Sequence, residues 1–210
     1  MRYSILKFFL LLSLKSFSQS PQVDTIIQTS IYRSYFDFET KQTMQLNYIL
    51  HKGGGDCNRG KFKFLNDTGL ATSTTKDYYK SGYDMGHLAN AEDFAYDCEM
   101  MELTFRMYNC LPQYPNLNRG IWKKWERKIR EKSQGDSLLI ICGATFKSEK
   151  IGNDVYVPEH FYKVVKSITT NEIKWVLWFK NVKEDAEKYS EVITLEELEK
   201  RLGYRIDLKY

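Results

Sequence analysis

The sequence lacks the features that mark several classes of protein. It contains no internal repeat, no low-complexity tract and no recognisable linker between domains. It has no Cys-x-x-Cys pair or closely spaced set of histidines and cysteines, so a structural zinc site is not expected. Apolar residues make up 42% and charged residues 28% of the 210 positions, which excludes a disordered chain, a collagen-like fibre and a multi-span membrane protein. We expect one domain over residues 21–210.

The sequence also has little excess of one sign of charge over the other. The formal net charge is +4, but residues 1–20 combine a positive start at Arg2 and Lys7 with a short apolar run and a small-x-small pattern at 16–18. This predicts a signal peptide cleaved at about residues 18–20, and hence a secreted or periplasmic protein without a membrane anchor. A buried amino-terminal helix fits less well, because the segment is apolar on all faces. Removing residues 1–20 takes away three basic and no acidic residues, so the charge falls to +1 and says little about partners.

Cysteines are few, and their surroundings divide them into two pairs. Export to an oxidising compartment favours disulfides. Cys57 and Cys98 lie in polar, loop-like sequence and form the candidate disulfide. Cys110 and Cys142 lie in apolar runs, where buried free thiols are common.

Hydrophobic periodicity predicts a mixture of strands and helices without strict alternation. Residues 21–40 read as a leading segment and residues 66–83 as a long surface loop. A capping box at Thr194 starts a last helix, which Gly203 ends. We expect strands at 44–50, 62–64, 104–111, 138–142, 161–165 and 173–179, and a helix at 117–133. This order favours an α+β fold over a doubly wound sheet.

Only three histidines could act as a general base, namely His51, His87 and His160. His87 follows the long polar loop, and Asp84 and Gly86 precede it. A nearby carboxylate could orient the imidazole, and the glycine allows another backbone to approach closely. A single histidine in a loop is nevertheless more often an ordinary surface residue. A second group of functional residues is therefore needed to support His87 as a catalytic base.

That second group lies in residues 109–126, where an Asn- and Pro-rich turn leads into the predicted helix. Asn118 lies at the start of this helix and Glu126 about two turns later, so that both lean toward one side. Amide and carboxylate oxygens suit Mg²⁺, directly or through water. On the residues alone, Asn118 could equally be a helix cap and Glu126 a surface charge.

Together the two stretches resemble the DNA/RNA non-specific endonuclease family, the ββα-metal group that includes mitochondrial endonuclease G. The family pattern is Asp-Arg-Gly-His, an Asn one strand later, then Pro-Gln, Leu-Asn and a Trp before a helical Glu. Type and spacing agree at Asp84, Gly86, His87, Asn109, Pro112, Gln113, Leu117, Asn118, Trp122 and Glu126. The likeness covers roughly residues 44–205. Met85 departs from it by replacing the family's Arg, which we expect to affect rate, substrate preference or pH optimum.

The resemblance implies a mainly antiparallel central sheet with flanking helices and a ββα-metal motif. It also implies a hydrolase that uses Mg²⁺, for which Mn²⁺ could substitute, to cut DNA and RNA internally and leave 5′-phosphate ends. In that mechanism His87 would be the general base and Asn118 the metal ligand. The family also suggests a homodimer, although no dimer pattern is visible in the sequence.

Other roles carried over from the family concern the surroundings of the site. Asn109 and Glu126 would orient the site and its metal-bound water, and Asp84 would position the region of His87. Arg59 would neutralise charge on the phosphate, with Lys61 as the alternative.

Basic residues crowd the predicted helix and could grip phosphates without reading sequence. A solvent-exposed charged face is the ordinary alternative. The substrate-binding candidates are Arg119, Lys123, Lys124 and Arg127, and Lys128, Arg130 and Lys132 lie nearby. The acidic stretch formed by Glu92, Asp93, Asp97, Glu99 and Glu102 is expected to face away from nucleic acid or to bind a cation.

Three other functions fit parts of the sequence. Met85 would suit a catalytically weakened nuclease fold that only binds nucleic acid. The bland composition allows a metal-independent, disulfide-stabilised binding module, although the paired motifs speak against it. A Cys-His hydrolase would use Cys98 or Cys110 with His87, but neither cysteine has a recognisable nucleophile context.

Overall fold

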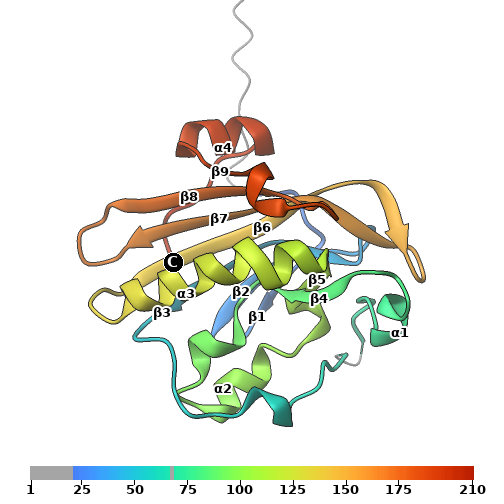
Figure 1. Ribbon diagram of the computed structural model, residues 1–210, viewed down its shortest axis with the longest axis horizontal. Helices are drawn as coiled ribbons and strands as arrows, with labels where there is room; N and C mark the ends of the chain where they lie inside the picture. Colours follow the sequence, from blue (N-terminus) through green and yellow to red (C-terminus); the bar gives the residue numbers. More distant parts are fainter. Residues whose placement is uncertain (1–20, 67–68) are drawn as a thin grey trace, which may run out of the picture.

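The computed structural model describes residues 21–66 and 69–210, so the expected signal peptide at 1–20 lies outside the described residues. A seven-stranded sheet has the order β1-β2-β3-β6-β7-β8-β9, with all neighbours antiparallel, and β4 and β5 pair separately (Figure 1). The strands are β1 Thr25–Gln28, β2 Tyr32–Asp37, β3 Gln42–Leu50, β4 Asp84–His87, β5 Cys110–Gln113, β6 Leu138–Ile151, β7 Val155–Ser167, β8 Ile173–Lys180 and β9 Ser190–Val192. The predicted α+β class is confirmed.

Helices are short and few beside the large sheet. The α-helices are α1 Thr75–Tyr78, α2 Cys98–Leu103, α3 Lys123–Ser133 and α4 Leu195–Leu202. Single turns are η1 Arg59–Lys61, η2 Ala91–Phe94, η3 Met107–Asn109 and η5 Ala186–Tyr189, and η4 Leu117–Trp122 is π-helical. Within the described ranges, none of these helices has the length and apolar character needed to cross a membrane.

The central strands are buried on both faces, because α3 and α4 cover opposite sides of the sheet (Figure 1). Alternate residues of β6 enter different cores, so Ile140 packs on the α3 side and Ile141 on the α4 side. Trp122 and Ile129 fill the first core, and Leu198 fills the second. The α3 side also carries β4, β5 and the short turns that surround the candidate site.

The predicted helix over 117–133 is present but is interrupted at Gly120. The backbone there has φ −99° and ψ −113°, which breaks the regular helix between η4 and α3. Glycine reaches this conformation because it has no Cβ. At the carboxyl-terminal end of the chain, Thr194 caps α4 and left-handed Gly203 ends it, as predicted.

Strand β4 brings His87 to its place through a close approach to β5. Asp84 pairs with Gln113 and His87 with Cys110. A Cβ on Gly86 would lie 2.2 Å from Oε1 of Gln113, so any side chain here would displace that residue. The Asp-x-Gly-His stretch therefore forms a strand, not the loop suggested by its polar surroundings.

The expected disulfide between Cys57 and Cys98 is present, and its Cα atoms lie 5.4 Å apart. It fastens the segment before η1 to the first residue of α2. Cys110 and Cys142 are buried free thiols, also as expected.

Two sequence predictions of strands are wrong. Phe62 and Phe64 follow η1 in irregular structure, and both rings pack on Phe105 instead of alternating across a sheet. The segment 104–111 contains the turn η3 and the start of β5, because α2 ends immediately before it.

The leading segment 21–40 is more regular than expected. Strands β1 and β2 form there and continue the sheet beyond β3. Tyr32, Ser34 and Phe36 alternate inward along β2, so a period-two pattern was present in the sequence but was masked by polar neighbours.

The disulfide is expected to contribute substantially to stability. It closes a sequence separation of 41 residues, for which the loss of unfolded-chain entropy corresponds to about 4 kcal/mol. Replacing Cys57 and Cys98 together by Ser should lower the free energy of unfolding by an amount of this order, measured by urea denaturation. Dithiothreitol should destabilise the wild type and leave the double variant unchanged; an equal effect on both would contradict the prediction.

Candidate active site

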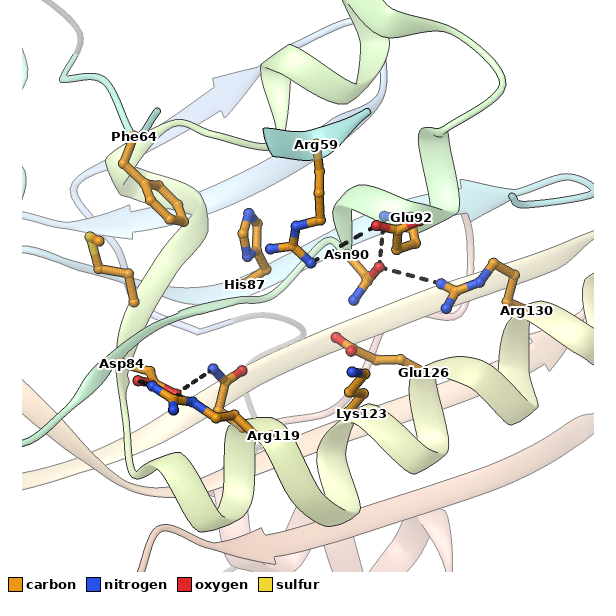
Figure 2. A pocket seen from close by; sticks show the side chains of 12 residues that line it. Arg59, Phe64, Asp84, His87, Asn90, Glu92, Arg119, Lys123, Glu126 and Arg130 are labelled. Carbon is orange, nitrogen blue, oxygen red and sulfur yellow. Dashed lines mark hydrogen bonds and ion pairs between the residues drawn. The ribbon is translucent and has the colours of Figure 1, made fainter. Parts of the chain in front are cut away.

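A cavity of about 450 Å³ lies where η1, β4 and the η4–α3 helix face one another. In Figure 2, Arg59 and His87 lie across the cavity from Lys123 and Glu126, which rise from the helix. Its lining combines basic, acidic, amide and aromatic side chains: Arg59, Phe64, Asp84, Met85, His87, Asn90, Glu92, Asn118, Arg119, Lys123, Glu126 and Arg130. The cavity thus unites residues from both sequence motifs.

His87 is held by aromatic packing. Its ring centroid lies 4.8 Å from that of Phe64 and 5.0 Å from that of Phe105. Burial, together with the nearby charge of Arg59, lowers the pKa of His87 to about 3. Within the described part of the chain, Nε2 of the ring is enclosed without a hydrogen-bond partner. The imidazole is therefore kept neutral by its surroundings, and no carboxylate of residues 21–66 and 69–210 is hydrogen-bonded to it.

The other two histidines lie outside this cavity. His51 makes a 2.7 Å hydrogen bond with Ser137 near the end of α3, and His160 stacks on Trp178 at 4.7 Å. The structure therefore places only one of the three candidate bases, His87, in the cavity.

The side-chain contacts of Asp84 among the described residues are to the helix, and its expected role in positioning the region of His87, with which it shares β4, stays a prediction. Asn118 donates through Nδ2 to the Asp84 carboxylate at 2.9 Å. Arg119 donates to the same carboxylate from Nε and Nη2 at 2.7 and 2.5 Å. Because the amide nitrogen of Asn118 is used in this way, its oxygen is the atom available to a cation. Asn118 is also not a side-chain helix cap.

Glu126 is a buried carboxyl group on the helix face that looks into the cavity. Burial raises its pKa, while the charge of Lys163 and the amide of Asn90 act in the opposite direction. Nearby, Arg130 donates to Asp93 at 2.5 Å in a second buried arrangement. The alternative in which Glu126 is a surface charge is therefore wrong.

Asn109 lies outside the cavity lining and supports the backbone that follows His87. Its side-chain oxygen accepts from the amide of Ala89 at 2.9 Å. Its Nδ2 donates to the carbonyl oxygens of Ala89 and Thr104 at 2.9 and 2.7 Å. Every one of these bonds is to backbone, so Asn109 would orient the site through the chain that follows His87, and its role toward metal-bound water stays a prediction.

Arg59 reaches the cavity from η1, whereas its alternative, Lys61, is exposed and does not line it. Its Nη1 lies 4.0 Å from Glu92, and its guanidinium carbon lies 6.0 Å from the ring centroid of Phe105. The disulfide of Cys57, which precedes Arg59 by two residues, anchors this part of the chain.

The basic side chains of the helix line two concave sites, the main cavity and an adjoining groove. Arg119 and Lys123 line the main cavity, as expected of phosphate-binding residues. Lys124 and Arg127 line only an adjoining groove of about 330 Å³. Lys124 donates to Glu187 at 2.5 Å, and Arg127 lies 4.0 Å from Glu131. These last two lie beside the cavity, not in it.

Sequence reasoning missed Asn90 and named Arg130 only as a basic neighbour of the substrate-binding candidates. Arg130 follows Glu126 by four positions and so shares its helix face, and Asn90 lies three positions after His87. Helical spacing could have found Arg130. The acidic stretch also departs from expectation, because Glu92 lines the cavity and Asp93 is buried, while Asp97 caps α2.

The donor atoms in the cavity fit a hard divalent cation. Asn118 and Glu126 bring an amide oxygen and a carboxylate to the same space. Among residues 21–66 and 69–210, no three or more His, Cys, Asp and Glu side chains gather into a metal cage. A site with few protein oxygens suits Mg²⁺, which keeps much of its water.

Comparison with known proteins agrees with this geometry. The family model of the DNA/RNA non-specific endonucleases matches residues 14–209. Mitochondrial endonuclease G of Bos taurus is 34% identical over 164 residues, which cover 69% of this chain and 55% of the relative. A nuclease of Nostoc sp. is 37% identical over 99 residues, covering 46% of this chain and 36% of the relative. The chain thus spans about half or less of the length of these curated relatives.

A solved structure shares the fold. A chain of the EndoG/EndoGI complex, whose crystal structure describes the mechanism of EndoG inhibition, superposes with a TM-score of 0.75 at 23% identity, covering 88% of this chain and 86% of that one. The sequence match over nearly the whole chain and the shared architecture lead to one conclusion: the chain belongs to the DNA/RNA non-specific endonuclease family.

Proposed function

We propose that the protein is an exported, Mg²⁺-dependent endonuclease that hydrolyses DNA and RNA without sequence preference and leaves 5′-phosphate ends. The observation that carries the proposal is the cavity itself, in which a buried neutral histidine faces an asparagine and a carboxylate among cationic side chains. Export rests on the signal-peptide pattern of residues 1–20.

His87 acts as the general base in this proposal. Its low pKa keeps the ring unprotonated at neutral pH, so it is ready to accept a proton from an attacking water. Because Nε2 is enclosed, Nδ1 is the nitrogen left for that task. Phe64 and Phe105 fix the ring plane through packing, which replaces the carboxylate that orients many catalytic histidines.

Positive charge near the phosphate comes from side chains and from the divalent ion. Arg59 and Lys123 approach the cavity from opposite sides and would neutralise the non-bridging oxygens (Figure 2). Asn118 would hold the ion, with its amide oriented by the hydrogen bond to Asp84. Glu126 would orient water at the site. The ion, when bound, supplies charge that stabilises the departing 3′-oxygen.

The same lining explains a lack of sequence preference. Phosphate contacts carry no sequence information, and they are weakened by salt. The cations that could contact phosphate lie on the helix and η1. The overall charge adds little attraction, because the chain without residues 1–20 has a net charge of only +1. DNA and RNA share the phosphodiester, so both are proposed substrates.

Supercoiled plasmid provides the decisive test. The wild type should nick it with Mg²⁺ or Mn²⁺ and stop on addition of EDTA, and Asn118→Ala should weaken the metal-dependent rate. His87→Ala should lower the rate by at least about 100-fold, which is the lower end of what a general base contributes. His51→Ala is the matched control and should behave as wild type. Full turnover by folded His87→Ala would contradict the proposed mechanism.

The neutral state of His87 can be measured without metal or substrate. We expect its ring resonances, assigned by comparison with His87→Ala, to stay in the neutral form from pH 8 to about pH 4, since burial and Arg59 disfavour protonation. Side-chain NMR across this pH range checks the expectation. A midpoint near 6.5, the ordinary value for histidine, would contradict it.

Substitution of Met85 tests whether the protein is an efficient nuclease or a weakened relative that only binds nucleic acid. It lines the cavity beside Asp84 and His87, where an arginine would add charge for the phosphate. Met85→Arg should therefore raise kcat/KM several-fold, while the neutral Met85→Gln should not, as measured by plasmid nicking. Tight plasmid binding without nicking by either the wild type or Met85→Arg would favour the binding protein.

A further inference from the structure

The disulfide between Cys57 and Cys98 lies beside the candidate site and is open to solvent. Cys98 is exposed and Cys57 is half-buried. The bond joins the chain just before η1 to the first residue of α2. Exposed disulfides are more readily reduced than enclosed ones, and disulfides with a regulatory role belong to this class. The oxidation state of this bond is therefore within reach of thiols in solution.

The turn that carries Arg59 has few other attachments to the protein. None of residues 54–66, all of which the structure describes, is buried. Hydrogen bonds inside the turn join Gly60 to Oδ1 of Asn58 at 2.9 Å and the amide of Phe62 to the carbonyl oxygen of Arg59 at 3.1 Å. These bonds shape η1 without attaching it to a neighbouring element.

The chain is held differently on the two sides of the turn. Before it, the amide of Cys57 donates to the carbonyl oxygen of Ala95 at 3.0 Å, next to the disulfide. Beyond it, two aromatic rings pack on Phe105, and Leu65 donates to the carbonyl oxygen of that residue at 2.9 Å. Exposed backbone with few buried contacts opens locally at low free energy. Loss of the disulfide should therefore free residues 54–61 and leave the later part in place.

The contacts of the Arg59 side chain are too weak to hold the turn by themselves. Its Nη1 lies 4.0 Å from Glu92, and the two side chains are 51% and 40% exposed. Exposed ion pairs of this kind contribute little to stability. Its guanidinium carbon lies 6.0 Å from the ring centroid of Phe105. Glu92 precedes Cys98 in the chain and Phe105 follows it, so the disulfide ties the turn to the segment that holds both partners of Arg59.

We propose that the Cys57–Cys98 disulfide is a redox switch that positions Arg59 in the cavity, so that reduction of the bond releases the turn and lowers nuclease activity. The effect on activity rests on the proposed function, whereas the release of the turn rests on the contacts of residues 54–66. Thiols stay reduced in the cytosol and pair after export. The chain would therefore have low activity among the nucleic acids of the cell that makes it, and full activity outside.

The chemistry of the switch is thiol–disulfide exchange. When the bond forms, the thiols of Cys57 and Cys98 lose two protons and two electrons, and a second disulfide, on a small molecule or a thiol oxidoreductase, accepts them and becomes two thiols. When the bond is reduced, a dithiol supplies the two protons and two electrons and is itself oxidised to a disulfide. Cys110 and Cys142 are buried free thiols and take no part in the exchange.

Amide hydrogen exchange in EDTA, followed by mass spectrometry, tests the release of the turn without metal, substrate or turnover. Dithiothreitol should raise the exchange rate of residues 54–61 at least tenfold and leave β6 and β7 within twofold. The double variant Cys57→Ser, Cys98→Ser should match the reduced wild type with or without dithiothreitol. An unchanged turn would overturn the proposal, and so would faster exchange throughout the sheet, which would mean that the whole protein unfolds.

Plasmid nicking with Mg²⁺ tests the consequence for activity. Reduction of the wild type should lower kcat/KM at least tenfold, and reoxidation with glutathione disulfide should restore it. In Arg59→Gln, reduction should change kcat/KM less than twofold, because the cation that the disulfide positions is already absent. Equal losses in the two proteins would mean that the disulfide only stabilises the fold, which contradicts the proposal.

Cys142→Ala is the matched control. It removes a buried thiol and keeps the disulfide, so its oxidised form should nick plasmid as the wild type does and lose activity on reduction to the same extent. Should the oxidised wild type fail to nick any plasmid, the proposed function falls, while hydrogen exchange in EDTA still decides whether reduction releases the turn.

Discussion

The packing of Trp122 against the sheet is the contact on which the rest of the site depends. Its ring meets Phe161 and Phe179 edge to face at 5.5 and 5.2 Å, and this fixes the junction between η4 and α3. The side chains at 118, 119, 123, 126 and 130 then project from the same helix into the cavity. A core contact thus sets the direction of the polar groups, because one helix serves both surfaces.

Burial then determines the chemistry of the groups around the cavity. The same loss of water that keeps His87 uncharged makes an ionised Glu126 costly, so one group is prepared for its task and the other needs compensation. Aromatic rings surround His87 and exclude water from it, and nearby cations offset the cost of ionising Glu126. The site therefore combines apolar surroundings at His87 with positively charged surroundings at Glu126, within one small cavity.

The resemblance to the family predicted the meeting of His87, Asn118 and Glu126, whereas helical spacing alone predicted only that Asn118 and Glu126 lean toward one side of the helix. Local sequence patterns also predicted the disulfide, α4 and the buried central strands. They did not reveal partners that come from distant segments: the carboxylate of Asp84 accepts from the helix, and Asn109 is hydrogen-bonded to backbone. Tertiary contacts of this kind leave no local periodicity, whereas β2 did carry a period-two pattern that polar neighbours masked.

The cavity is assembled from stretches far apart in the chain: the disulfide-anchored turn with Arg59, the strand with His87, and the helix from Asn118 onward. None of these can enclose the space alone, and each depends on the sheet for its position. Within the described residues, the candidate site is therefore complete only in the assembled fold. A cut in the polypeptide that frees either the turn or the helix should open the cavity, so loss of the proposed activity should accompany cooperative unfolding.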